Sequence, residues 1–139
     1  MELKSIDQQL SVSAQILPSD IVELAQLGYG LVINNRPDGE AADQPSSQQI
    51  ESACKEQGLD YVYLPLVPNQ VTPQLVAQYA ESLAGADTKV LAFCRTGNRS
   101  CTLWALGKAG QLDTDQIINK GVELGYPLEG LRPMLDGAV

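Results

Sequence analysis

The chain has 139 residues, a formal net charge of -8 and no histidine. That length suits one domain, residues 1–139, which can bury about two-thirds of its unfolded surface without disulfide or metal staples. Because histidine is absent, the chain cannot contain a Ser-His-Asp triad, a Cys-His pair or an HExxH zinc site.

The net charge and the cysteine content indicate which partners and which compartment to expect. Nine basic against seventeen acidic residues repel a phosphate backbone, so we expect no nucleic-acid partner. Three cysteines without a CxxC pair favour a reduced, cytoplasmic protein. The segment from Met1 to Leu10 is polar, and no apolar run reaches about 18 residues, so we expect neither a secretion signal nor a membrane span.

No metal site or cofactor is expected either. The acidic residues show no spacing typical of an oxygen-ligand loop. We interpret four of them as a solvated face: Glu40, Asp43, Glu51 and Glu56.

Short apolar runs alternate with amphipathic segments along the chain. Strands are expected over residues 10–13, 30–34, 61–64 and 90–93. Helices are expected over residues 18–27, 46–57, 72–83, 100–109 and 113–124, with a last short one over 128–135. Ser46 with Gln49 can form a capping box, and Thr72-Pro73 supplies an N-cap and a first helical proline. This alternation predicts an α/β domain with a mainly parallel central sheet of four to five strands flanked by helices.

A loop without periodicity, residues 35–45, follows the second predicted strand. It leaves the carboxyl end of that strand, where open α/β sheets place their ligands. Arg36 either reaches a bound anion from this position or is a solvated loop arginine. Asp38 either contributes an acid to the site or forms a turn before Gly39.

The stretch Cys94-Arg-Thr-Gly-Asn-Arg-Ser100 contains the main candidate catalytic and anion-binding residues. A buried strand ends at Cys94, and a helix begins near Arg99 or Ser100. Such a loop can direct successive backbone N–H groups inward, where they form an anion cradle with the positive end of the helix. Arg99 would close the cradle with its fork of donors, and Gly97 permits a positive φ or a close backbone approach.

Cys94 is the candidate nucleophile of this loop. Helix N-termini and neighbouring arginines favour the thiolate form of a cysteine, and this activation needs no histidine. The alternative is a small buried residue at a strand end. Further candidate binding residues are Arg95, Thr96, Asn98 and Ser100. Cys101 is either a resolving thiol or a core residue, and we expect Trp104 to be a core anchor.

The cysteine loop resembles the active loops of two chemistries, those of dual-specificity phosphatases and of rhodanese sulfurtransferases. Four further segments make the resemblance more specific: residues 10–15, 32–40, 63–65 and 102–104. Together they resemble the bacterial family of beta-lactamase hydrolase-like, phosphatase-like domains, over about residues 7–135. The resemblance implies a dual-specificity-phosphatase-like fold, with Cys94 as nucleophile and Arg99 as anion-binding arginine. It also implies a functional link to a metallo-beta-lactamase-type hydrolase, because some members are fused to such domains.

Two departures from the phosphatase pattern keep other functions open. Phosphatases of this type place five residues between cysteine and arginine, whereas four stand here, which is the rhodanese length. The segment 67–72, where a phosphatase supplies its general acid, holds Asn69 and no acid, so Asp38 is the substitute.

The sequence therefore predicts a cysteine-dependent, phosphatase-like hydrolase for a small anionic substrate such as phosphate, sulfate or thiosulfate. The alternatives are a sulfurtransferase with a persulfide on Cys94 and a non-catalytic anion-binding module.

Overall fold

The computed structural model describes residues 1–137 and contains one five-stranded sheet in the order β1-β2-β5-β3-β4. The strands are β1 (Lys4–Ser5), β2 (Leu10–Ser13), β3 (Tyr29–Asn34), β4 (Asp60–Tyr63) and β5 (Lys89–Phe93). All neighbours pair in parallel except β1, which is antiparallel to β2. The expected α/β fold with a mainly parallel sheet is confirmed. The prediction omitted β1, since a strand of two residues is too short to show a pattern.

Of the helices in residues 1–137, three lie in the connections between strands and three follow the last strand. They are α1 (Ile21–Gln26), α2 (Ser47–Glu56), α3 (Pro73–Gly85), α4 (Asn98–Lys108), α5 (Thr114–Leu124) and α6 (Arg132–Asp136), with short 3-10 turns η1 (Pro18–Asp20) and η2 (Glu129–Leu131). The capping box is confirmed, because Ser46 Oγ accepts from the Gln49 N–H and the Gln49 side chain accepts from the Ser46 N–H. Thr72 likewise caps α3. These caps use backbone donors that no helix can satisfy internally.

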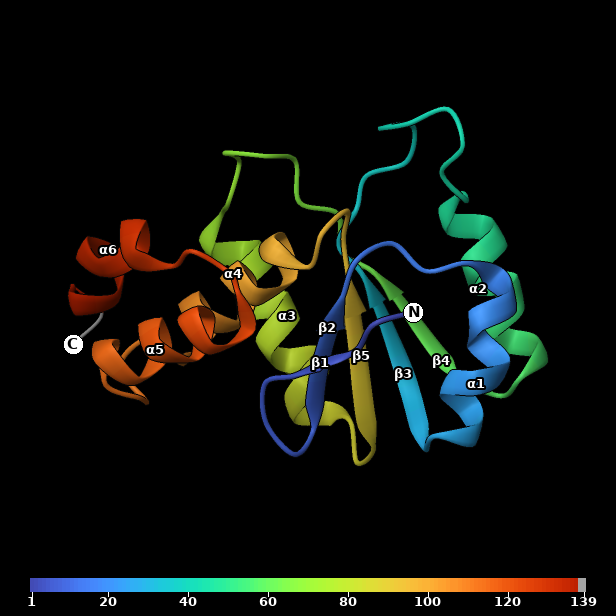
Figure 1. Ribbon diagram of the computed structural model, residues 1–139, viewed down its shortest axis with the longest axis horizontal. Helices are drawn as coiled ribbons and strands as arrows, with labels where there is room; N and C mark the ends of the chain where they lie inside the picture. Colours follow the sequence, from blue (N-terminus) through green and yellow to red (C-terminus); the bar gives the residue numbers. More distant parts are fainter. Residues whose placement is uncertain (138–139) are drawn as a thin grey trace.

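Both faces of the sheet are covered. Figure 1 shows α1 and α2 on one face and α3 to α6 on the other. Successive side chains of β5 serve the two faces in turn: Val90 and Ala92 belong to the hydrophobic cluster with α3 to α6, and Leu91 and Phe93 to the cluster with α1 and α2. A strand buried on both faces must be apolar throughout, which explains its unbroken apolar run.

Three loops meet at one end of the sheet. They follow β3 (residues 35–46), β4 (residues 64–72) and β5 (residues 94–97), and Figure 1 shows them rising together at the upper end. Parallel strands make this meeting necessary, because their carboxyl ends share one edge. None of the helices within residues 1–137 has the length and apolar character that a bilayer crossing needs.

Candidate active site

The cysteine loop curls around the sulfur of Cys94. This residue follows β5 directly, and its Sγ accepts a hydrogen bond of 3.0 Å from the Gly97 N–H. Helix α4 begins one residue later, at Asn98, slightly earlier than expected. Cys94 has no exposed surface. The sulfur therefore lies at the floor of the loop, beneath its neighbours, rather than in an open pocket.

Several backbone N–H groups of the loop have no protein acceptor. Asn98 N–H donates to Thr96 Oγ1 at 3.2 Å, whereas those of Arg95, Thr96, Arg99 and Ser100 donate to no atom of residues 1–137. Unpaired amides at a helix start carry partial positive charge and are suited to bind an anion.

Hydrogen bonds hold one edge of the Arg99 guanidinium group. Nη1 donates to Glu40 Oε2, Nη2 donates to Glu40 Oε1, and Nη1 also donates to the Leu66 carbonyl, each at 2.8 Å. The hydrogen bonds that Arg99 donates to Glu40 raise the pKa of Arg99, and the neighbouring Cys94 sulfur raises it further. The second edge, formed by Nε and the other Nη2 proton, has no oxygen or nitrogen acceptor in the described chain, and its neighbour is the Cys94 sulfur. One bidentate fork of Arg99 therefore stays available to an anion beside Cys94.

Glu40 holds two arginines at once. Its Oε1 accepts from Arg36 Nε at 3.0 Å as well as from Arg99. The hydrogen bond from Arg99, more than any other partner, lowers the pKa of Glu40. Glu40 lies at the surface, as expected, but its side chain is only 22% exposed and bridges Arg36 and Arg99, which the interpretation as a solvated face did not include. Sequence spacing could not show this contact, since 59 positions separate Glu40 from Arg99.

Arg36 is buried, which excludes the solvated-arginine alternative. Its Nη1 donates to Gln15 Oε1 at 3.0 Å and its Nε to Glu40. Arg36 therefore reaches the site through Glu40: it holds the carboxylate that holds Arg99.

Asp38 has structural partners in the loop. Its Oδ1 accepts from the Ser47 N–H at 2.7 Å, at the first turn of α2, and its own N–H donates to the Tyr63 hydroxyl at 2.9 Å. Neither Cys94 nor Arg99 is among its hydrogen-bond partners in the described chain. The structure thus places Asp38 in the loop beside the site, and its role as general acid stays a prediction.

Asn35 fastens the base of the cysteine loop. Its N–H donates to the Phe93 carbonyl and its Nδ2 to the Leu64 carbonyl, while its Oδ1 accepts from the buried Ser100 hydroxyl, each at 2.8 Å. One residue thus joins the ends of three strands to α4. Sequence reasoning named Ser100 but missed Asn35. The signal that could have found it is the pair of asparagines at the end of an apolar strand, which indicates hydrogen bonding there.

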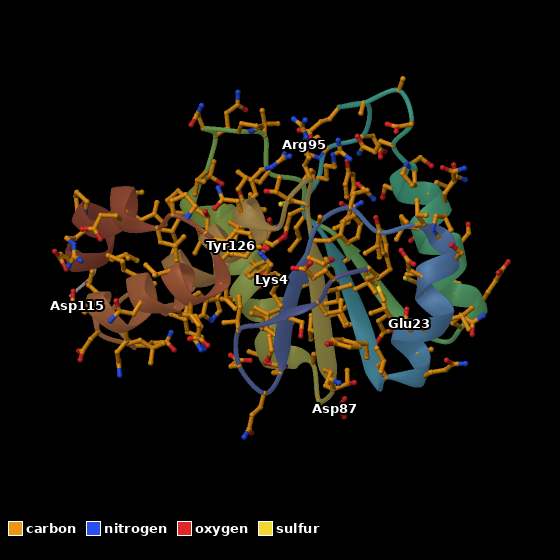
Figure 2. All side chains as sticks on the ribbon, in the orientation of Figure 1. Lys4, Glu23, Asp87, Arg95, Asp115 and Tyr126 are labelled. Carbon is orange, nitrogen blue, oxygen red and sulfur yellow. The ribbon has the colours of Figure 1, made fainter. Side chains whose placement is uncertain are left out.

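Tyr126 closes the other side of the loop. Its hydroxyl donates to the Thr96 carbonyl at 3.1 Å, and the Lys4 ammonium group lies 4.6 Å from its ring centre. Both residues are labelled in Figure 2. Gly97 has a φ of 98°, and a Cβ there would overlap the Tyr126 hydroxyl. The positive φ expected for Gly97 is confirmed, and the neighbouring Tyr126 is a second reason for glycine at this position.

The remaining predicted site residues differ in exposure. Arg95 and Thr96 are exposed, and Figure 2 shows Arg95 at the loop end of the sheet. Asn98 is half-buried, and its Oδ1 has no hydrogen-bond partner in the described chain. No cluster of residues suited to a metal ion occurs within residues 1–137.

Cys101 and Trp104 pack into the core on α4. Trp104 is 4% exposed, which confirms the expected core position. Burial raises the pKa of the Cys101 thiol to about 12, so this thiol stays protonated near neutral pH. A protonated, fully buried thiol is a poor partner for disulfide exchange, which favours the core alternative for Cys101.

Within the described residues, a cysteine surrounded by unpaired loop amides, with an arginine beside it at the end of a mostly parallel sheet, fits the class of phosphatase-like domains. Comparison with known proteins supports this class. The chain belongs to the family described as beta-lactamase hydrolase-like protein, phosphatase-like domain, whose model matches residues 2–111. It is therefore a phosphatase-like domain.

Three relatives illustrate the similarity. A beta-lactamase hydrolase-like protein of Agrobacterium fabrum is 32% identical over 130 residues, which are 92% of this chain and 30% of that protein. A crystal structure of a candidate phosphatase from Neisseria meningitidis is 32% identical, with a TM-score of 0.86 over 97% of this chain and 96% of that one. TpbA of P. aeruginosa, in complex with phosphotyrosine, has the same fold at 17% identity, with a TM-score of 0.70 over 98% and 86% of the two chains.

The chain spans less than a third of the length of the curated relative from Agrobacterium. The similarity therefore concerns one domain of those longer proteins.

Proposed function

We propose that this domain is a cysteine-dependent, phosphatase-like hydrolase that transfers a small anionic group, such as a phosphoryl group, onto Cys94. The observation that supports this function most directly is the free Nε–Nη2 edge of Arg99 beside the Cys94 sulfur and the unpaired loop amides. This set of donors matches the charge of a phosphoryl group, which has several negatively charged oxygens.

The proposed reaction has two steps. The Cys94 thiolate attacks phosphorus, so that an S–P bond forms while the P–O bond to the leaving group breaks, and the leaving oxygen takes a proton. Water then attacks phosphorus, the S–P bond breaks, and inorganic phosphate leaves as the thiolate is restored. Arg99 and the amides of Arg95, Thr96, Arg99 and Ser100 bind the phosphoryl oxygens in both steps. Asp38 is the proposed proton donor, with water as the alternative.

Access to the sulfur is part of this proposal. Because Cys94 is fully buried, substrate reaches it only when the groups above it shift. Arg99 is half-buried and is held from the outer loops by Glu40 and the Leu66 carbonyl, so these loops must admit the anion.

The test is turnover of an aryl phosphate by the wild-type protein and three variants. Cys94→Ser should lose turnover completely, and Arg99→Lys should reduce kcat by about 10²–10³-fold because the bidentate fork is lost. Cys54→Ser is the matched control, since it alters another buried cysteine remote from the loop. Turnover that persists in Cys94→Ser would overturn the proposed chemistry.

A sulfurtransferase is the second candidate, favoured by the four-residue spacing between Cys94 and Arg99. In that reaction the thiolate attacks the outer sulfur of thiosulfate, sulfite leaves, and Cys94 keeps one added sulfur atom as a persulfide. Mass analysis of the Cys94 peptide after thiosulfate, and separately after aryl phosphate, separates the two candidates. Anion binding that survives Cys94→Ser, without either adduct or turnover, would instead indicate a binding module. The link to a metallo-beta-lactamase-type hydrolase stays a prediction.

A further inference from the structure

A groove of about 540 Å³ opens beside Arg99, on the side of the cysteine loop that faces the C-terminal helices. Three segments form its walls: the loop after β4, the first turn of α4 and the η2–α6 region. The lining residues are Leu66, Pro68, Asn69, Val71, Asn98, Arg99, Thr102, Pro127, Gly130, Leu131 and Met134. Its size is typical of sites for small organic ligands, which occupy about 300–1,000 Å³.

The groove is uncharged apart from Arg99. No carboxylate and no other basic group lines it, although the chain has 17 acidic residues in 139. Its walls are largely apolar, and two of the apolar side chains are notably open to solvent: Val71 is 37% exposed and Met134 is 54% exposed. Apolar surface left exposed next to one cation suits a ligand with an anionic head and an uncharged, apolar body.

Arg99 links the groove to the proposed reaction centre. The same side chain lies next to the Cys94 sulfur, lines the groove and is held by the carbonyl of Leu66, which is itself a wall residue. Arg99 is thus shared by the groove and the anion site, so an anion bound to its free edge lies next to the groove. In an in-line displacement the leaving group projects away from the attacking sulfur, outward past the loop. The body of the substrate then lies among the walls that rise above the loop.

We propose that this groove binds the apolar body of the substrate, so that the domain prefers anions attached to an aryl or alkyl group over small inorganic anions and over polyanions. This inference rests on the proposed function only for the position of the anionic head. The groove itself is a binding site that the reaction at Cys94 does not require.

The test uses methyl-, butyl- and hexylphosphonate, which share one head group and cannot be hydrolysed. Their dissociation constants are measured by calorimetry. Each buried methylene should tighten binding by up to about fourfold until the groove is filled. Val71→Ser should weaken hexylphosphonate by about threefold to tenfold and leave methylphosphonate nearly unchanged. Met134→Ser should act in the same direction.

Val122→Ser is the matched control. Val122 is 71% exposed on α5 and does not line the groove, so the same substitution there should leave all three constants unchanged. Thermal melting of each variant checks that the fold is kept. Equal affinity for the three phosphonates, or a chain-length effect that Val71→Ser and Met134→Ser leave intact, would overturn the groove proposal.

Failure of the groove and failure of the proposed function give different results. If aryl phosphate is turned over but chain length has no effect, the groove proposal fails and the hydrolase stands. If chain length matters but no aryl phosphate is turned over, the groove stands and the hydrolase fails. If no phosphonate binds, the anion-binding role of Arg99 fails, and the groove proposal fails with it.

Discussion

Replacement of Glu40 by glutamine separates two effects that the carboxylate has on Arg99. Glutamine keeps the length of the side chain but removes its charge and turns one oxygen into a donor. Oε1 accepts from both arginines and Oε2 from Arg99 alone, so the amide oxygen will take the Oε1 position. The new NH₂ group then faces Nη1 of Arg99, donor against donor. Arg99 loses one of its two bonds to this side chain and the alignment that the pair imposed.

The two effects change different kinetic constants: the lost alignment of Arg99 lowers kcat, whereas the lost charge of Glu40 strengthens the binding of an anion. Loss of a hydrogen bond to a charged group costs about 1.5–3 kcal/mol, so the free energy of unfolding should fall by about that amount. A misaligned Arg99 stabilises the transition state less, and kcat should fall by about tenfold or more. Two unit charges about 6 Å apart repel each other by about 0.7–3 kcal/mol at an effective dielectric constant of about 80 to 20, and removal of the Glu40 charge relieves a repulsion of this order on a bound anion. Inorganic phosphate should therefore bind at least about threefold more tightly.

The assay is steady-state turnover of aryl phosphate with inorganic phosphate as competitive inhibitor, together with urea unfolding. Glu56→Gln is the control for net charge, because Glu56 forms no ion pair within residues 1–137. We expect Glu40→Gln to lower both kcat and the inhibition constant of inorganic phosphate, whereas Glu56→Gln should change neither. An unchanged kcat in Glu40→Gln would show that Glu40 does not position Arg99.

Three further predictions concern the same end of the sheet. Gly97→Ala should lower the free energy of unfolding by about 1–3 kcal/mol in urea titration, because the residue has a φ of 98°. Adding Tyr126→Phe should restore part of the loss by removing the overlapping hydroxyl. Equal stability of Gly97→Ala and wild type would contradict this. Asp38→Asn keeps an acceptor for the Ser47 N–H, so the fold should persist, while kcat for a poor leaving group should fall by about 10²–10⁴-fold if Asp38 is the acid; full turnover would exclude that role. Because Arg99 lowers the pKa of Glu40, the stability that Glu40 contributes is complete above its unfolded pKa of about 4.3 and is lost as the pH falls through the lower folded value. The stability difference between wild type and Glu40→Gln should thus shrink from pH 7 toward about pH 3, and a constant difference in urea unfolding would refute this.

Local signals in the sequence were enough for the elements and for the central loop. The Ser46–Gln49 capping box and the Thr72 cap act over three residues, so their spacing alone predicts where α2 and α3 begin. The unbroken apolar run of β5 indicates a strand covered on both faces. Cys94, Gly97 and Arg99 lie within six consecutive residues, and one strand-to-helix turn brings them together wherever the rest of the chain goes.

Only the tertiary structure decided how that loop is held and what surrounds it. Glu40, Asn35 and Tyr126 reach the loop from positions 30 to 65 residues away in the chain. The parallel strand order brings in Asn35 and Glu40, which follow β3, whereas Tyr126 arrives through the packing of the helices after β5. Arg36 shows the same limit, since its partners are Glu40, four positions away in an aperiodic loop, and Gln15, 21 positions away, and no pattern in the sequence pairs them. Backbone patterns report contacts within one element, whereas ion pairs between loops depend on which strands are neighbours. The chemistry of the site is thus readable from a short motif, while its charge balance and its apolar groove are products of the fold.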